Sequence, residues 1–387
     1  MGLTPRERVL ATINHEVPDR VPIIMGVSNA TGIKMKPYQQ LKEILGIKSE
    51  DKYIYQWPEL GTAEIDEETM LRLSVDVRGV LDLEDSETLN RNQNRPPHSP
   101  YISSWGTGQK EIEPGVWFSG VHPLEQATAI EEIEKHPWPD MSAPSRVAHV
   151  KAEAQKLADE DQFAIMGTPW LMFPFQRAFG LQGMSTFLEN MALRPDFAEA
   201  LLKKNAELCK SMLTNFLTET GNNIDIIKIG DDLGSQNSLM ISPEMYRQIL
   251  KPIHADLIAT IKKQTDAKIF FHTDGDVQPL IGDFIEIGID ILNPIQTSAG
   301  KMSDLVGLKK QFGKNMVFCG GIDTHRVLPF GSPTEVRQEV RRVINALGQD
   351  GGYMVSSVHT IMNDVPAENI LAMVDAVEEF GYYPLEK

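Results

Sequence analysis

The chain has 387 residues, 41% of them hydrophobic, a formal net charge of −17 at pH 7 and a sequence pI near 5.0. An acidic excess of this size argues against nucleic acid or an anionic membrane as a partner, because both require a basic face. No apolar run approaches membrane-spanning length, the N-terminal segment lacks the apolar core of a signal peptide, and the two cysteines are too few for a disulfide framework. We therefore expect a cytoplasmic globular protein that does not bind membranes.

Apolar runs alternate with helical patterns from the start of the chain. Thr4 and Glu7 flank Pro5 in the pattern of a capping box, which predicts a helix that ends before Pro18. Buried strands are then predicted at residues 21–26, 75–81, 163–168 and 224–230, with helices between them. Segment 82–123 is rich in turns and aromatic residues but too short for its own core, so we interpret it as a β-hairpin-like insertion after the second strand.

The second half of the chain repeats the same alternation. Residues 268–296 predict one βαβ unit, in which a strand, a polar elbow, a helix and a second strand follow one another. Further strands are predicted at 316–323 and 352–359, and the last helix at 366–380. Eight strands alternating with helices predict a (β/α)8 TIM barrel that forms a single domain over residues 1–387, with the chemistry at the carboxyl ends of the strands. A doubly wound sheet is the competing fold, and the count of eight disfavours it.

Polar and aromatic residues follow several of these strands, and a barrel would bring them to one mouth. The candidates are Asn29, Trp170, Phe173, Asp231, Asp232, His272, Asp274, Gln296 and His359. His272 and Asp274 lie two residues apart, so they point to the same side of the pleat and can share a metal ion with His359. The alternative is that both histidines only form hydrogen bonds with neighbouring carboxylates. We predict that Asn29, Trp170, Phe173 and Gln296 contact the substrate.

Asp231 and Asp232 end the fourth strand and are the candidate catalytic residues. One of them suits a general acid or base or a substrate anchor, although Asp232 equally suits a helix cap and Asp231 could point outward. The loop at residues 169–175 is unusually apolar. It fits a lid or core packing, or an aromatic substrate or flat cofactor if it is exposed at the mouth. The glycine-rich nucleotide motifs and the G-x-S-x-G elbow do not occur, so nicotinamide, ATP and serine-hydrolase functions lack support.

Several short motifs are in the style of the uroporphyrinogen decarboxylase superfamily, and the resemblance covers essentially the whole chain. They lie at Arg8–Ala11, Pro18–Pro22, Trp138–Asp140, Gly320–Asp323 and Asp364–Asn369. True uroporphyrinogen decarboxylases carry an arginine-rich signature after the first strand, which holds the carboxylates of the substrate. Residues 25–32 contain no arginine. Because an octa-acid substrate without its arginines is hard to defend, we reject the decarboxylase assignment despite the fold.

The other main branch of the superfamily consists of zinc-dependent methyltransferases that exchange methyl groups with corrinoid proteins. Those enzymes carry a His-x-Cys pattern after the fifth strand and a second cysteine after the eighth. In this sequence His272 matches the histidine, Asp274 stands at the first cysteine, and His359 stands at the second. The resemblance therefore implies a metal site at these three residues, with zinc as the expected metal and iron as an alternative.

The two substitutions also bear on the substrate. Two histidines and one carboxylate make a harder, more Lewis-acidic metal site than thiolates do, which suits an oxygen ligand. We therefore expect methyl transfer between a small methoxylated substrate, for which an aromatic ring is one option, and the cobalt of a corrinoid protein. The alternatives are a decarboxylase or lyase of a small acid and a non-catalytic barrel that binds a corrinoid or tetrapyrrole. The resemblance also suggests a homodimer.

Overall fold

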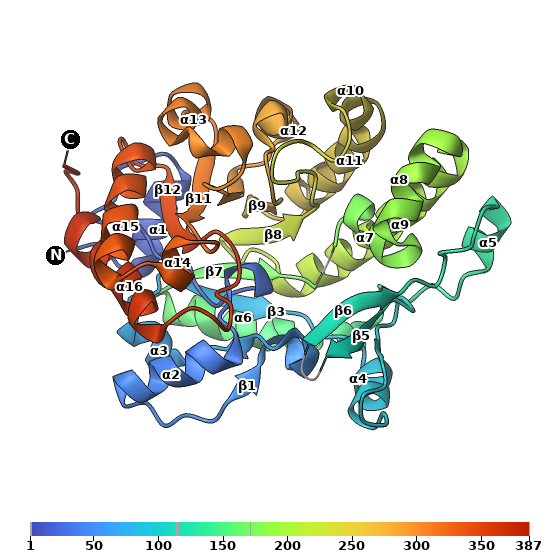
Figure 1. Ribbon diagram of the computed structural model, residues 1–387, viewed down its shortest axis with the longest axis horizontal. Helices are drawn as coiled ribbons and strands as arrows, with labels where there is room; N and C mark the ends of the chain where they lie inside the picture. Colours follow the sequence, from blue (N-terminus) through green and yellow to red (C-terminus); the bar gives the residue numbers. More distant parts are fainter. Residues whose placement is uncertain (1, 114–115, 171, 387) are drawn as a thin grey trace.

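A curled parallel sheet forms the centre of the molecule, and helices surround it (Figure 1). The computed structural model describes residues 2–113, 116–170 and 172–386. The sheet has seven strands in the order β12-β11-β10-β9-β8-β7-β3, and every neighbouring pair is parallel. The strands are β3 (Val77–Leu81), β7 (Ala164–Thr168), β8 (Ile226–Gly230), β9 (Lys268–His272), β10 (Ile291–Ile295), β11 (Val317–Ile322) and β12 (Tyr353–Ser357).

The predicted first strand, at residues 21–26, does not form a regular strand. Its extended backbone nevertheless lies between β12 and β3. Val355 N donates to Pro22 O at 2.8 Å, and Asp76 N donates to Ile23 O at 3.0 Å. Pro22 has no N–H, and the N–H of Ile23 donates to the Asp76 carboxylate at 2.7 Å, so a continuous ladder cannot form. This segment takes the place of the eighth strand, and the predicted TIM-barrel class of fold is confirmed.

The helices alternate with the strands along the chain. The longer ones are α1 (Pro5–Ile13), α2 (Met35–Leu45), α6 (Val150–Glu160), α7 (Pro174–Gln182), α8 (Met184–Leu193), α9 (Pro195–Thr220), α11 (Lys251–Lys262), α12 (Ile281–Ile287), α13 (Leu305–Phe312), α15 (Pro333–Leu347) and α16 (Ala367–Phe380). The shorter ones are α3 (Glu67–Arg72), α5 (Ile130–Lys135), α10 (Pro243–Met245) and α14 (Val327–Phe330). Helix α5 begins at Ile130, because the Glu132 carboxylate accepts the N–H groups of Thr128 and Ala129 and fixes the start of the helix there.

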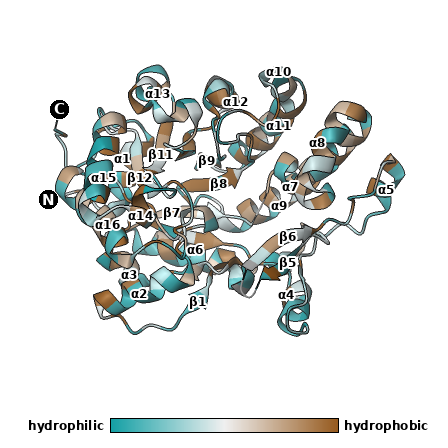
Figure 2. Ribbon diagram, viewed as in Figure 1, coloured by the Kyte–Doolittle hydropathy of each residue, from teal (hydrophilic) through white to brown (hydrophobic). Residues whose placement is uncertain are grey.

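Two apolar layers hold the barrel together. Side chains that alternate along the strands fill the lumen, and those between them pack against the helices. On β8, for example, Ile226 belongs to the lumen cluster, whereas Ile227 and Ile229 belong to the layer under the helices. Figure 2 shows the hydrophobic colour concentrated on central strands such as β8. Cys319 also lies in the lumen, where burial raises the pKa of its thiol, in keeping with an inert cysteine.

Segment 82–123 lies at one edge of the barrel (Figure 1). It contains α4 (Ser86–Gln93) and an antiparallel sheet in the order β4-β5-β6, formed by β4 (Tyr101–Ile102), β5 (Gly108–Glu113) and β6 (Val116–Val121). A smaller pair, β1 (Lys52–Tyr53) and β2 (Ala63–Glu64), lies before it in the chain. The interpretation of residues 1–387 as one domain with an insertion stays a prediction. Across the described residues, no helix has both the length and the apolar character needed to span a bilayer.

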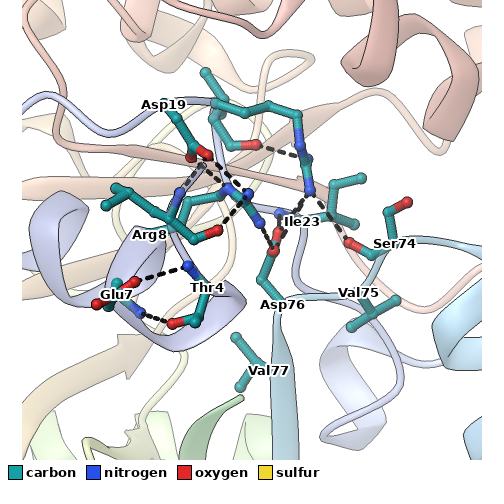
Figure 3. A network of polar contacts seen from close by, with 12 residues as sticks. Thr4, Glu7, Arg8, Asp19, Ile23, Ser74, Val75, Asp76 and Val77 are labelled. Carbon is teal, nitrogen blue, oxygen red and sulfur yellow. Dashed lines mark hydrogen bonds and ion pairs between the residues drawn. The ribbon is translucent and has the colours of Figure 1, made fainter. Parts of the chain in front are cut away.

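A buried ionic network anchors α1 to the barrel (Figure 3). The Asp76 carboxylate, at the start of β3, lies between the guanidinium groups of Arg8 and Arg20, at 2.5 and 3.2 Å. Asp19 accepts from Arg8 at 2.7 Å, on the exposed side of the network. Burial raises the pKa of Asp76, and the two arginines oppose that shift. The network joins α1, the extended segment at residues 21–26 and β3.

Candidate metal and substrate site

The alternation of side chains along the strands determines which residues reach the mouth of the barrel. Ile226 of β8 and Phe270 of β9 both lie in the lumen cluster. Residues two and four positions further along each strand point the same way, so Lys228 and His272 rise toward the carboxyl ends on the lumen side. The register supports this arrangement, because Lys228 pairs with Phe270 and Gly230 pairs with His272. The site is thus built on the ends of two adjacent strands.

Three potential metal ligands converge above these strands. One oxygen of Asp274 lies 3.8 Å from Nε2 of His272 and 3.8 Å from Nε2 of His359. One ligand atom from each residue can be chosen so that all three lie within 4.8 Å of one another. Two atoms bonded to one zinc ion at about 2.1 Å lie no more than about 4.2 Å apart, so both carboxylate–histidine separations already fit a shared ion. The side chains present therefore fit a divalent metal after a small adjustment.

Asn293, on the neighbouring strand β10, fixes the orientation of His272. Its amide nitrogen donates to the carbonyl of Cys319 at 3.5 Å, which turns its oxygen toward Nδ1 of His272 at 2.7 Å. Nδ1 must then carry the proton, and Nε2 presents its lone pair toward Asp274 and His359. Buried hydrogen bonds of this kind orient histidine ligands in metal sites.

Glycines allow the loops around these ligands to approach closely. A Cβ at Gly230 would lie only 2.5 Å from the carbonyl oxygen of His272. A Cβ at Gly275, whose φ is +88°, would lie 2.3 Å from the backbone of Gly234. The loops that follow β8 and β9 consequently touch, and Gly234 N donates to Asp274 O at 3.1 Å. This contact supports the backbone that carries the Asp274 ligand.

A cavity of about 110 Å³ opens beside the histidines. It is lined by Asn29, Ala30, Trp170, Met172, Gln176, Lys228, Gly230, Asp232, His272 and His359. Burial lowers the pKa of His359 to about 4, so this imidazole is neutral near pH 7 and available as a ligand. Burial also lowers the pKa of Lys228 to about 8. The cavity thus combines metal ligands, one lysine, one further carboxyl group and an aromatic wall.

Asp232 is the carboxyl group that faces this cavity. Burial, reinforced by the negative charge of Asp274, raises the pKa of Asp232 to about 6. Its oxygens accept hydrogen bonds from the side-chain amide of Gln176 and from Asp274 N, the latter at 3.2 Å. A carboxyl group with a pKa this close to neutrality can hold or release a proton under physiological conditions. Asp232 is therefore the member of the Asp231–Asp232 pair that lines the cavity, and its acid or base role stays a prediction.

Three of the predicted site residues lie away from the cavity. Asp231 is fully buried on the helix side of β8, where it accepts hydrogen bonds from Phe175 N, Gln176 N and Nε2 of His254. This carboxylate holds the start of α7 and does not face the cavity, and its predicted catalytic role stays untested. Alternation along the strand explains the difference, since Asp232 shares the lumen side with Ile226 and Lys228, whereas Asp231 faces outward.

Phe173 and Gln296 are likewise displaced from the predicted substrate contacts. Phe173 is fully buried and packs its ring against His254 and Phe271, so it belongs to the core. Gln296 accepts the N–H of Gly275 at 2.7 Å and thereby supports the loop after β9. Asn29 and Trp170 line the cavity, and their contact with a substrate stays a prediction. Residue 171, within the predicted apolar loop, lies outside the described residues.

Several residues of the site were not among the predicted ones. Lys228, Gln176 and Met172 line the cavity, and Asn293 orients a ligand from behind. Lys228 had a detectable signal, because it interrupts the apolar run of β8 at a position that faces the lumen. Gln176 and Asn293 depend on contacts between elements far apart in the sequence, which no local pattern reveals.

The fold and the site together define an α/β barrel with a histidine–carboxylate cluster at the carboxyl ends of its strands. The family model described as uroporphyrinogen decarboxylase (URO-D) matches residues 120–380. The chain belongs to this family, which confirms the resemblance noted in the sequence.

Comparisons with individual proteins agree with this assignment. The chain is 23% identical over 221 residues to the uroporphyrinogen decarboxylase of Psychromonas ingrahamii, and 24% identical over 224 residues to that of Coxiella burnetii. These matches span 56% of this chain and 58% and 56% of the two relatives, a little over half of their length. Among solved structures, a methyltransferase from Methanosarcina mazei shares the fold with a TM-score of 0.61 at 19% identity, over 98% of this chain and 99% of that one.

Proposed function

We propose that this protein is a metal-dependent methyltransferase that moves a methyl group between a small methoxylated substrate and the cobalt of a corrinoid carried by a partner protein. The observation that carries the proposal is the convergence of His272, Asp274 and His359, whose ligand atoms lie within 4.8 Å of one another. These residues come from the ends of β9 and β12 and stand where the related corrinoid-dependent methyltransferases have His, Cys and Cys. The ligand set suits zinc, with iron(II) as an alternative.

The chemistry of the ligand set points to an oxygen-containing substrate. A divalent metal held by two imidazoles and one carboxylate supplies Lewis acidity that makes an ether oxygen a better leaving group. Asn293 keeps the Nε2 lone pair of His272 directed at the cluster, and burial keeps His359 neutral near pH 7. Both histidines are thereby prepared as ligands before any metal arrives.

The remaining residues of the cavity have separate roles in this proposal. Asp232 holds a proton close to the leaving oxygen, and Gln176 fixes the position of its carboxyl group. Trp170, whose ring packs against Tyr55 with the centroids 4.7 Å apart, provides an apolar wall for the substrate. Asn29, from the N-terminal part of the chain, contributes a polar side chain to the cavity. Together they orient a small molecule next to the metal ligands.

The cavity argues against the decarboxylase activity named for the sequence relatives. No arginine lines it, so the described residues offer no guanidinium forks for a substrate with many carboxylates. A volume of about 110 Å³ is also small for a tetrapyrrole. The full-length likeness to a methyltransferase fold and the replaced ligand pattern support the methyltransferase branch instead. A decarboxylase of a small acid would need no metal, which separates it from the proposal.

Methyl transfer to free cob(I)alamin tests the proposal directly. Zinc-loaded protein is incubated with a panel of methoxylated aromatic and aliphatic compounds, and methylcobalamin formation is followed by its absorption spectrum. We expect formation with at least one ether, a loss of 100-fold or more in His272→Ala, and full activity in the control His98→Ala, whose imidazole is exposed at the surface. Failure of every ether in the presence of bound metal would rule the proposal out.

A further inference from the structure

Lys228 is a cationic side chain in the cavity that has no anionic partner. It lies in the middle of β8, on the lumen side, and lines the cavity beside Asp232, His272 and His359. Among the described residues, no carboxylate lies within ion-pair distance of its ammonium group and no hydrogen bond satisfies it. The charges of Asp232 and Asp274 act on it only from further away.

Lys228 is a half-buried lysine without a charged partner, between apolar residues of the lumen. Charged side chains in barrel interiors are normally paired, because moving an ammonium group out of water is unfavourable. The neighbouring lumen residues Ile226 and Phe270 show that the strand accommodates apolar side chains at this depth. A charged residue that lacks a compensating contact among apolar neighbours is expected at a functional position. A ligand group that accepts hydrogen bonds would supply the contact that Lys228 lacks.

Asn29 supplies a second unsatisfied donor in the same cavity. Its side-chain oxygen accepts the hydroxyl of Thr62 at 2.8 Å, which leaves the amide N–H₂ group without an acceptor among the described residues. Lys228 and Asn29 thus both present N–H groups, and neither is matched by a protein oxygen. Two donors, one of them charged, complement a carboxylate.

The charges and the size of the cavity narrow the choice of anion. Asp232 and Asp274 would repel a dianion such as phosphate, which proteins usually hold with arginine forks or several backbone N–H groups. A divalent ion on the three ligands would leave the cavity net positive and favour a monoanion. The volume of about 110 Å³ suits a small acid.

We propose that Lys228, assisted by Asn29, binds the carboxylate of the substrate, so that the methyl donor is a small methoxylated carboxylic acid rather than a neutral ether. This inference rests on the proposed function, because it names the substrate class of the same site. Lys228 acts as a specificity-determining residue that anchors one end of the molecule. The other end, which carries the methoxy group, is then directed to the metal ligands and Asp232.

Isothermal titration calorimetry on the full chain, with and without added zinc, tests the proposal. Two matched pairs serve as probes: 4-methoxybenzoate with 4-methoxybenzyl alcohol, and methoxyacetate with 2-methoxyethanol. We expect the wild type to bind at least one acid 10-fold or more tightly than the matching alcohol. Lys228→Met should reduce this preference to about 1, Asn29→Leu should reduce it several-fold, and Lys203→Met, an exposed lysine on α9, should leave it unchanged.

Two further readouts separate the possible outcomes. The melting temperature of Lys228→Met should equal or exceed that of the wild type, because the unpaired charge is removed, so a loss of acid binding cannot be assigned to unfolding. Equal affinity for acid and alcohol in the wild type, no binding of either acid, or a preference retained in Lys228→Met would overturn the inference. Methyl transfer from neutral ethers alone would overturn it while leaving the proposed function intact. Acid binding that depends on Lys228 but leads to no methyl transfer would overturn the proposed function, and with it the assignment of the acid as methyl donor, and would leave Lys228 only as a carboxylate-binding residue.

Discussion

Asn293 shows how one side chain outside the proposed ligand set can orient a candidate metal ligand. It joins the carbonyl of Cys319 to Nδ1 of His272, and so determines which imidazole nitrogen faces the other ligands. Such partners of metal-binding histidines are worth about 10- to 100-fold in metal affinity. The orientation of His272 therefore depends on a residue of β10 that is not itself one of the candidate ligands.

We predict that Asn293→Ala weakens zinc binding by about 10- to 100-fold, because His272 loses its fixed tautomer and orientation. Competition with a chromophoric zinc chelator measures the affinity. The exposed Asn94→Ala serves as the matched control and should bind zinc like the wild type. Unchanged affinity in Asn293→Ala would mean that the hydrogen bond to Nδ1 does not orient a ligand.

Which side chains lie in the site could be predicted from the sequence mainly through the alternation of side chains along the strands. The two-residue spacing of His272 and Asp274 predicted that their side chains lie together. His359 was identified only through the resemblance to known enzymes, by its position ahead of Val365–Pro366 in the motif at Asp364–Asn369. The choice between Asp231 and Asp232 was left open, although counting from Ile226 along β8 places Asp232 in the lumen. Phe173 precedes α7, and its ring packs against Phe271, which agrees with the core-packing alternative for this loop.

Two acidic residues, Asp76 and Asp82, join elements of the barrel in different ways. Asp76 is paired with Arg8 and Arg20, at 2.5 and 3.2 Å (Figure 3). Asp82 follows β3 and accepts the N–H of Trp170 in the loop after β7. It has no ion-pair partner among the described residues, and burial raises its pKa to about 7. The first contact joins α1 to the sheet, and the second positions the aromatic wall of the cavity.

We predict that Asp76→Ala lowers the free energy of unfolding by about 3–5 kcal/mol, because it leaves two guanidinium groups and the N–H of Ile23 without their buried acceptor. Urea unfolding followed by circular dichroism measures the effect. Asp161→Ala, which removes an exposed partner of Arg6, should cost about 1 kcal/mol or less. A loss at Asp76 no larger than at Asp161 would show that the network of Figure 3 does not stabilise the barrel.

Asp82 predicts a distinct pH dependence. Its pKa in the fold, about 7, lies above the usual value of 3.8, so its contribution to stability is fully present below pH 3.8 and is lost as the pH rises through 7. Asp82→Asn removes this titration. Between pH 5 and pH 8, the free energy of unfolding of the variant should gain about 2 kcal/mol relative to the wild type. Urea unfolding at the two pH values provides the comparison.

The control for Asp82 is Asp159→Asn, an exposed carboxylate on α6. Its unfolding free energy should follow the wild type at both pH values. If the free energy of unfolding of Asp82→Asn also changes with pH as that of the wild type does, the buried carboxyl group does not titrate in this range and its inferred environment is wrong.

Most of the barrel could be anticipated at the level of the whole molecule, because parallel strands buried on both faces appear as short apolar runs bounded by glycine and polar residues. The segment at 21–26 is the exception. It matched the pattern, but Pro22 and the Asp76 carboxylate divert its backbone groups, so it closes the barrel without a regular ladder. The insertion was expected as a hairpin, and β4 and α4 add to it through contacts that local patterns do not encode.

The whole-molecule architecture also explains why the site is assembled from distant segments. Lys228, Asp232 and His272 come from the neighbouring strands β8 and β9 and the residues that follow β8. His359 follows β12, and Asn29 follows the extended segment at residues 21–26. Loops at the carboxyl ends of barrel strands meet over the lumen, so residues far apart in the chain share one cavity. Zinc bound there should also raise the melting temperature, because it binds only the folded chain.

The central claim is that His272, Asp274 and His359 hold one divalent metal ion, and metal analysis of protein purified without chelators tests it most directly. Inductively coupled plasma mass spectrometry, before and after incubation with zinc and dialysis, gives the metal content per chain. We predict about one equivalent in the wild type and in the surface control His98→Ala, and loss of most of it in His272→Ala, Asp274→Ala and His359→Ala. A folded wild type that retains no metal, or variants that retain as much as the wild type, would contradict the account.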